Sequence, residues 1–359
     1  MLILYELKKQ LEQPFAYIFL AICFAVNIFL CNNSYNNSEI NSQSKLVSET
    51  GTFYMTEEIA QSIEDERMRS IALQYVGKEI SPEDAAAILM DCSLHGSYRF
   101  DESFSEHIAE ISSEQLTKRL EEIAEKDELS AVNGGGELFW VLSSIVWAVA
   151  IESVIFTLLM TAKILGHETV SQTAAVILST RTGRRINLVK AAASVIISIA
   201  FQAVNFLLCC TLFFALCPCF NLLSAPFALD YPTVIPWLDT TVGGYFMLNF
   251  LMSLLLTAIF SLMSFCCSGK NGGIRQFFLS LILAFCLYIP AFFKLGFISP
   301  FFRCLTPTAL LFNQPGCWLS VSQSGIAVFG ADIFAMIFWA AVCAVGSILA
   351  YKKFKKSPL

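Results

Sequence analysis

Long apolar stretches alternate with short polar segments over most of the chain. A membrane-spanning helix needs about 20 consecutive apolar residues. Six stretches approach or exceed that length, and the first and fifth are the shortest: residues 15–31, 138–162, 188–217, 243–267, 277–293 and 333–351. The pattern predicts an all-α membrane protein with six transmembrane helices. Transmembrane helix 1 is residues 15–31, and residues 137–351 hold helices 2–6.

The first stretch has a basic start and an apolar run, as a cleaved signal peptide also has. The residues that end it, Ile28-Phe29-Leu30-Cys31, are bulky and offer no small-residue cleavage site. An uncleaved anchor is therefore the favoured reading.

The segment between the first and second stretches, residues 32–136, has the pattern of a separate helical domain. Residues 32–54 are rich in Asn and Ser, which is typical of a linker. Apolar spacing then predicts three helices. The second opens at Ser81-Pro82, an N-cap followed by a proline in the first turn, and the third covers about residues 103–129. Residues 134–136 are three glycines, which predict a flexible hinge before the second span.

Charge is distributed so that one orientation is favoured. Residues 32–136 contain 21 acidic and 8 basic residues, a net charge of −13, whereas the remainder of the chain carries +7. Lysine and arginine concentrate before the first span, between the second and third, between the fourth and fifth, and in the tail 352–359. Because basic loops stay in the cytoplasm, both termini are expected there. The acidic domain 32–136 is then extracytoplasmic.

Composition excludes a soluble protein and a nucleic-acid-binding one. The chain is 56% hydrophobic and 14% charged, with a mean hydropathy of +0.63, whereas soluble proteins average about 25% charged residues. Most of the 13 cysteines lie in apolar stretches, and none has metal-ligand spacing in a soluble segment. His95 and His107 are more simply surface residues than metal ligands, so no metal site is expected.

Polar residues inside the apolar stretches are the candidates for a translocation pathway. Glu152 lies near the middle of the second stretch, where a carboxylate is costly. Two helix faces also carry polar residues at four-residue spacing: Ser194, Ser198 and Gln202 with Asn205 adjacent in the third stretch, and Asn249, Ser253, Thr257 and Ser261 in the fourth. These residues either line a route for a partly polar substrate or join neighbouring helices by hydrogen bonds.

The segment 167–195, between the second and third spans, carries the most specific pattern. Glu168 precedes a stretch that can form a short amphipathic helix, and a basic segment follows it. Arg184, Arg185 and Lys190 are expected to face the anionic inner leaflet. This part of the chain resembles the type-2 class of ABC exporter permeases. The matching residues are Glu168, Leu178, Ser179, Thr180, Arg184, Arg185 and Lys190.

Two further segments share the resemblance. Tyr5-Glu6-Leu7-Lys8-Lys9 is similar to the family's interfacial elbow helix, placed here at residues 1–14. Ile298-Ser299-Pro300 is similar to its outer re-entrant segment, placed at 295–330. Cys304 and Cys317 lie in that outer loop as a candidate disulfide, with two free thiols as the alternative. The resemblance does not cover residues 32–136.

The resemblance implies a function that needs other subunits. It implies a coupling loop at 164–187, in which Glu168, Ser179, Thr180, Arg184 and Arg185 contact a separate cytoplasmic ATPase. This chain is expected to have no nucleotide site of its own, because Ser268-Gly269-Lys270-Asn271 lacks the pattern of a phosphate loop. The separate ATPase is therefore expected to bind ATP and Mg. A second permease subunit, identical or different, is implied as well. The cargo is expected to be a peptide, an amphiphilic drug or a lipid.

Two other functions compete with transport. A sensor or immunity protein would bind an extracellular peptide through the acidic domain and move nothing. A membrane-embedded hydrolase would need paired acids or a histidine cluster at membrane depth, where the sequence places only Glu152. No enzyme chemistry is therefore expected.

Overall fold

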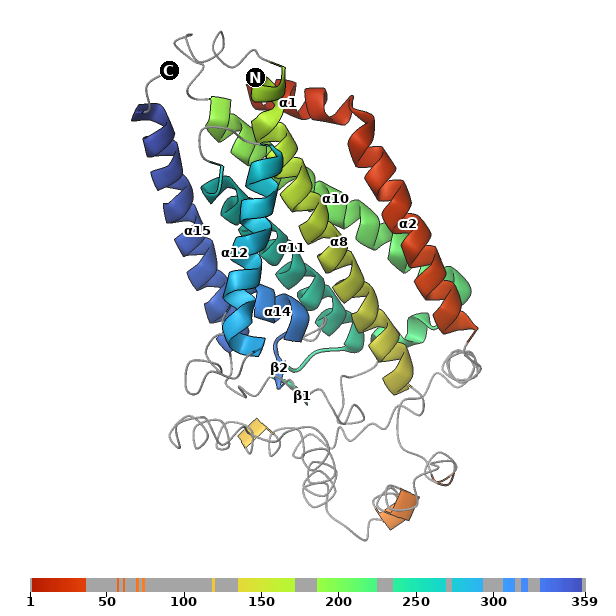
Figure 1. Ribbon diagram of the computed structural model, residues 1–359. Coiled ribbons are helices and arrows are strands. Elements are labelled where there is room, and N and C mark those ends of the chain that lie inside the picture. The colour runs from red at the N-terminus through yellow and green to blue at the C-terminus, as the bar shows by residue number, and fades with distance from the viewer. Residues whose placement is uncertain are drawn as a thin grey trace.

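The chain is described by a computed structural model in which helices run side by side in a bundle (Figure 1). The structure describes residues 2–36, 135–171, 186–224, 235–268, 273–292, 306–313, 318–321 and 330–356, with a few isolated positions between 57 and 119. The helices expected within 32–136 therefore lie almost wholly outside the described residues.

Five helices are long and apolar enough to cross a membrane, which confirms a multi-pass membrane protein. They are α2 (Pro14–Tyr35), α8 (Gly135–Val170), α10 (Ile186–Leu216), α11 (Val242–Cys266) and α15 (Ala331–Lys356). The expected fifth span corresponds to α12 (Ile274–Phe292), whose apolar part is shorter. Five small elements complete the described set: the short helices α1 (Leu2–Leu11) and α14 (Pro307–Asn313), the 3-10 helix η2 (Phe220–Ser224), and the paired strands β1 (Ile235–Pro236) and β2 (Ser320–Val321).

Local sequence explains where several helices begin. Pro14 opens α2, since a proline at the first helical position loses no hydrogen bond. The Thr241 hydroxyl caps α11 by accepting from the Gly244 N–H at 3.1 Å. Gly273 and Gly330 have positive φ angles of 96° and 76°, so each turns the chain into the helix that follows.

The boundaries of α8 differ from the expectation at both ends. Gly135 and Gly136 are its first residues. At these two positions the structure therefore has the first turn of a helix in place of the expected flexible hinge. At the other end α8 runs on through Val170, and Glu168 lies in its last turn rather than at the start of a separate helix. With 36 residues, α8 is about 54 Å long at 1.5 Å per residue, well beyond a hydrocarbon core of about 30 Å.

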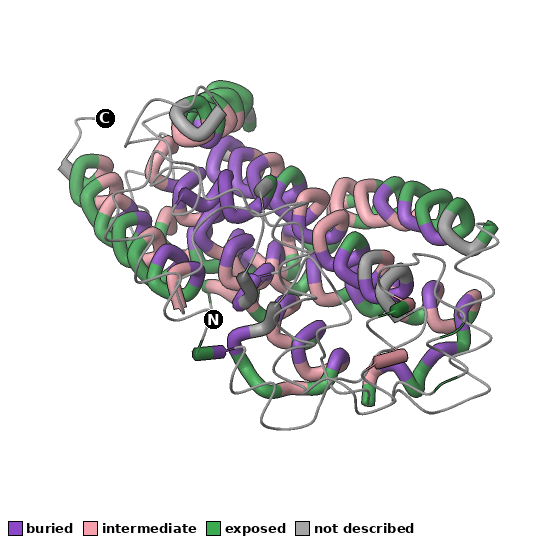
Figure 2. Tube along the Cα trace, turned by 90° about the horizontal axis from the view of Figure 1, so that it is seen from below, coloured by how far each residue is buried: buried purple, intermediate pink, exposed green. Residues whose placement is uncertain are grey.

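Helices α8, α10 and α11 form the centre of the bundle, and each contacts the other two. In α8 67% of the apolar window is buried, compared with 17% in α2 and 22% in α15. Seen along the bundle, buried positions gather in the interior and exposed ones line the outer faces (Figure 2). Since the outer faces of α2, α12 and α15 carry exposed large apolar side chains, these faces are suited to lipid.

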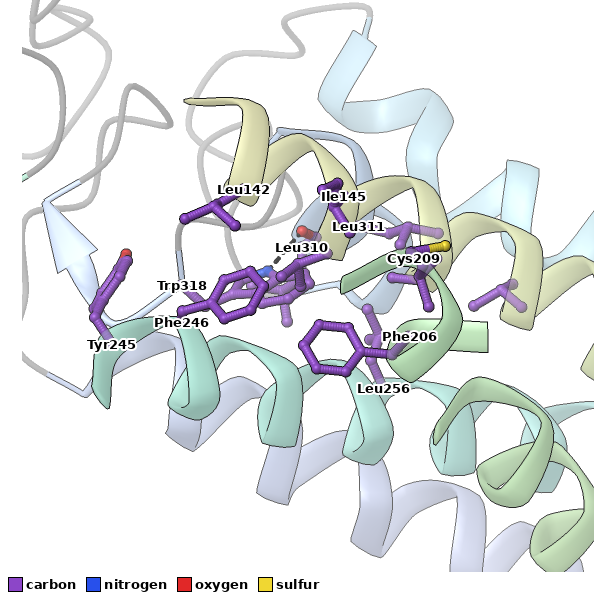
Figure 3. Packing of buried hydrophobic residues seen from close by; sticks show 14 of the residues in the cluster. Leu142, Ile145, Phe206, Cys209, Tyr245, Phe246, Leu256, Leu310, Leu311 and Trp318 are labelled. Atoms are coloured by element: carbon purple, nitrogen blue, oxygen red, sulfur yellow. Dashed lines mark hydrogen bonds between the residues drawn. The ribbon is translucent and has the colours of Figure 1, made fainter. Parts of the chain in front are cut away.

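Both ends of the described chain lie at one end of the bundle (Figure 1), and α14 closes the opposite end. The Trp318 side chain is fully buried there and its indole N–H donates to the Leu310 carbonyl at 2.9 Å (Figure 3). The Trp147 indole of α8 donates to the Leu311 carbonyl at 2.8 Å. Part of the expected outer loop 295–330 is thus packed into the bundle.

The segment 32–136 touches the bundle through one described contact. The Arg119 guanidinium lies 2.8 Å from a carboxylate oxygen of Asp239, just before α11, and Arg119 is almost fully buried. Arg119 is therefore tied to the residues that lead into a central helix.

Candidate functional site

Small polar side chains line the place where the three central helices meet. Each helix contributes three of them at four-residue spacing, so that they lie on one face of that helix. All are at most 1% exposed. We call this set the polar seam: Ser153, Thr157 and Thr161 of α8, Ser194, Ser198 and Gln202 of α10, and Ser253, Thr257 and Ser261 of α11.

Hydrogen bonds set the register of the polar seam at both of its ends. At one end Ser261 Oγ lies 3.1 Å from Ser194 Oγ and 3.4 Å from Thr161 Oγ1, which joins all three helices. At the other end the Gln202 amide donates to Ser253 Oγ at 2.7 Å. Since α10 runs antiparallel to α8 and α11 (Figure 1), the seam has three layers, one helical turn apart.

The middle layer consists of Thr157, Ser198 and Thr257. These three hydroxyls make no hydrogen bond with any described residue, and the same holds for Ser153 Oγ and Gln202 Oε1 in the adjacent layer. A buried polar group without a partner costs about 1–3 kcal/mol. The middle of the seam is therefore unfavourable in this arrangement of the helices, whereas its two ends are partly satisfied.

Glu152 belongs to a separate polar cluster, on the side of α8 that meets α2. One carboxylate oxygen, Oε2, accepts from the Asn27 amide at 2.9 Å and from the Asn205 amide at 2.6 Å. The donors come from α2 and α10, so the carboxylate links three helices. Of the two readings left open for Glu152, these bonds favour the one in which it joins neighbouring helices.

The end of the bundle that holds α1 contains a buried lysine. Lys190 is 0% exposed, and its ammonium donates to the Ile164 carbonyl near the end of α8 at 2.9 Å. The expectation that Lys190 faces lipid headgroups is therefore wrong, because α8 supplies a carbonyl partner inside the protein. Glu6 and Gln10 of α1 are also buried and bonded to each other, while Leu4 and Tyr5 are exposed.

The structure separates the expected pathway residues into three places, one of which is the cluster around Glu152. Ser198, Gln202, Ser253 and Thr257 come together in the polar seam. Asn249 does not join them: its Oδ1 accepts from the Trp318 backbone N–H at 2.6 Å, at the end of the bundle that holds α14.

The expected coupling and disulfide residues are mostly outside the described part of the chain. This applies to Ser179, Thr180, Arg184 and Arg185, and to Cys304 and Cys317. Only the backbone of Glu168 is described, in the last turn of α8.

Sequence reasoning missed four residues of these sites. Ser153, Thr157 and Thr161 are at the same four-residue spacing that identified the rows of the other two helices, so that signal was present. Asn27 is the fourth, and as a single polar residue in an apolar stretch it gave no periodic signal.

Comparison with protein-family models, with curated protein sequences and with solved structures found no match to this chain.

Proposed function

We propose that the chain is the membrane-spanning subunit of an ATP-driven exporter of the ABC type. In this proposal α12 is the fifth of six spans, both termini are cytoplasmic, and two permease subunits work with separate ATPase subunits that bind ATP and Mg. The cargo is a peptide, an amphiphilic drug or a lipid. The observation that carries the proposal is the buried polar seam with its unpartnered middle layer.

A purely structural seam would be expected to satisfy its own hydrogen bonds. Polar groups that join membrane helices do so by bonding across the interface, as Ser194 and Ser261 do. Thr157, Ser198 and Thr257 have no such bond among the described residues. In a second arrangement, with α8 and α10 moved together away from α11, these hydroxyls would bind water or a cargo, and the unfavourable burial would be relieved.

Two of the three helices that form the seam, α8 and α10, are also the two that lead to the proposed coupling loop. Helix α8 ends at Val170 and α10 begins at Ile186, so residues 171–185 connect them. The bond from Lys190 to the Ile164 carbonyl braces the two helix ends against each other. A push from an ATPase on this loop would therefore move α8 and α10 together at that end. The residues that would receive the push are Glu168, Ser179, Thr180, Arg184 and Arg185.

A sensor that binds an extracellular peptide is the second candidate. The contact between Arg119 and Asp239 favours it, because a change in the outer domain would act directly on the start of α11. A sensor does not require the unpartnered seam, and it requires no ATPase. The two functions therefore differ in what the seam variants do.

The test compares three substitutions of similar size. Ser198→Ala and Thr257→Val each remove a hydroxyl that has no partner in the described structure, so neither loses a hydrogen bond. Thr211→Val is the matched control, because Thr211 lies on α10 but is exposed and bonds only to the Leu207 carbonyl of its own helix. The tagged chain is purified from its native membranes, returned to lipid, and assayed for ATP hydrolysis by the ATPase that accompanies it.

The proposal expects Ser198→Ala and Thr257→Val to keep or raise the unfolding temperature while they change the rate of ATP hydrolysis. Thr211→Val should leave that rate unchanged. If no ATPase accompanies the wild-type chain, or if both seam variants hydrolyse ATP as the wild type does, the exporter proposal is refuted.

A further inference from the structure

A pocket of about 460 Å³ lies at the end of the bundle that holds both termini. It is formed where α2 and α12 begin and where the last turns of α8 pass between them. Its walls are almost wholly apolar and include Phe15, Leu159, Ala162 and Phe277. Its volume falls within the range of about 300–1,000 Å³ that is usual for small-molecule sites.

Positive charge lies at one side of this pocket. Lys163 contributes to its lining, and the Lys163 ammonium is 4.5 Å from the centre of the Phe15 ring. One turn further along α8, His167 also lines the pocket, and its Nδ1 lies 3.3 Å from the Lys9 ammonium. Two lysines and a histidine thus converge beside an apolar cavity.

The Glu6 carboxylate of α1 lies near His167 and Lys190, and Glu12 follows the end of α1. The Glu6 carboxylate is buried and accepts from the Gln10 amide at 2.9 Å, and Glu12 lies 3.7 Å from Lys8. Neither of these bonds is to Lys163. An apolar cavity beside lysines suits a ligand with an apolar chain and an anionic head.

The depth of the pocket suits a ligand that sits in the bilayer. Leu159, Lys163 and His167 belong to the last turns of the apolar stretch Val141–His167, where a span leaves the hydrocarbon core. A lysine at that level extends its ammonium toward the headgroups while its stem stays in apolar surroundings. The walls from α2 and α12 belong to helices whose other faces carry exposed apolar side chains.

We propose that this pocket binds an anionic phospholipid of the surrounding membrane. Part of one acyl chain occupies the space between Phe15, Leu159 and Phe277, and the phosphate lies at Lys163 and at the Lys9–His167 pair. The site is separate from the polar seam and does not depend on the transport function. It would hold α2, α8 and α12 together at this end of the bundle.

The full chain is purified in a mild detergent and examined by native mass spectrometry with two lipids of identical acyl chains, phosphatidylglycerol and phosphatidylcholine. The wild type should retain more phosphatidylglycerol. Lys163→Gln should weaken phosphatidylglycerol binding by about fivefold, since one lysine beside an anionic headgroup contributes about 1 kcal/mol. Lys353→Gln is the matched control, because Lys353 is an exposed lysine at the same end of the bundle on α15, and it should change nothing.

A second pair of variants tests the cavity itself. Ala162→Phe fills the pocket and should reduce retention of both lipids, whereas Ala341→Phe, at an exposed position of α15, should not. Should Ala162→Phe fail to fold, phosphatidylglycerol with a photoreactive acyl chain is crosslinked to the wild type and the labelled peptides are identified. The label is expected on peptides that contain Phe15, Leu159 or Phe277. Equal binding of the two lipids, no effect of Lys163→Gln relative to Lys353→Gln, or label only on other helices would each overturn the proposal.

Discussion

At the scale of single residues, the Glu152 carboxylate shows how a costly group is accommodated inside a membrane bundle. Asn27 and Asn205 both donate to the same carboxylate oxygen, from two different helices. An ionised carboxylate makes stronger hydrogen bonds than a neutral acceptor. A neutral amide oxygen at the same position, as in Glu152→Gln, could still accept both bonds. The three residues therefore behave as one unit that fastens α2 to α8 and α10.

We predict that Glu152→Ala lowers the stability of the protein by about 1–3 kcal/mol, because it leaves two amide groups without their acceptor. Glu152→Gln should have a smaller effect, since its side-chain oxygen takes the same place. Unfolding temperatures in detergent measure both. In a double-mutant cycle, Asn27→Ala should add little once Glu152 is alanine; fully additive effects would contradict this description of the cluster.

Asn249 and Thr257 share one face of α11 but have opposite surroundings. Asn249→Ala would remove the acceptor of the buried Trp318 N–H, so we predict a loss of about 1–3 kcal/mol. Thr257→Val removes a hydroxyl that has no partner among the described residues, and we predict no loss. Thermal unfolding of the two variants distinguishes them, and equal destabilisation would show that the seam hydroxyl is bonded after all.

At the scale of elements, α8 is long enough to extend from the interior of the bundle to beyond the hydrocarbon core of a membrane. The helix passes from the outer contacts of Trp147, through the polar seam, to the brace at Ile164 and on to Val170. A continuous helix transmits displacement along its axis, whereas a flexible loop does not. In the proposed exporter, the connection between α8 and α10 is therefore expected to matter for function more than for folding.

We predict that a Gly-Gly insertion after Ala174 leaves membrane insertion and thermal unfolding nearly unchanged, because the polar seam and the Lys190 brace lie outside the loop. ATP hydrolysis that depends on the partner ATPase should fall severely. Glu168→Ala should have the same effect on ATP hydrolysis more weakly, because it changes one side chain and leaves the length of the connection unchanged. It should not lower helix stability, since the negative end of the helix dipole disfavours an acid in the last turn of α8.

The control for this experiment is a Gly-Gly insertion after Gly272, between α11 and α12 at the same end of the bundle. That loop has no assigned contact with the ATPase, so the control should behave as the wild type. Equal effects of the two insertions would show that any loosening of this end disturbs the protein.

At the scale of the whole molecule, successive long helices reverse direction, so that the connections fall alternately at the two ends of the bundle (Figure 1). The basic segments before α2, around residues 172–185, between α11 and α12 and after α15 all belong to one end. The ends of α2 and α8 that flank the acidic segment 32–136 lie at the other end, with α14. This grouping is what the distribution of lysine and arginine requires if each connection stays on one side of the membrane.

We predict that a cysteine introduced at Thr182 is protected from a membrane-impermeant maleimide in intact cells and reacts after permeabilisation. A cysteine introduced at Asn36, which is exposed at the end of α2, should react in both conditions. The wild type measures the background from the native cysteines. Reaction at Thr182 in intact cells would reverse or abolish the proposed orientation.

Several features follow from the sequence alone because they depend only on neighbouring residues. A run of about 20 apolar residues is a membrane span wherever it occurs, so the five long helices could be predicted with errors only at their ends. Four-residue spacing likewise places Ser253 and Thr257 on one face of α11 without knowledge of any other helix. The same reasoning gave the wrong hinge at Gly135 and Gly136, because helix packing overrides the weak local preference of glycine.

Only the tertiary structure decided what each polar face meets. Asn249 and Thr257 lie on the same face of α11. Asn249 accepts a hydrogen bond from the Trp318 backbone N–H, whereas the Thr257 hydroxyl has no partner among the described residues. Lys190 has the charge expected of a residue that faces lipid headgroups. Inside the bundle, however, its ammonium donates a hydrogen bond to the carbonyl of Ile164 in α8, 26 positions earlier in the chain. Asn27 reaches Glu152 across 125 positions. These outcomes depend on the relative register of helices distant in sequence, and periodicity within one helix contains no information about that register.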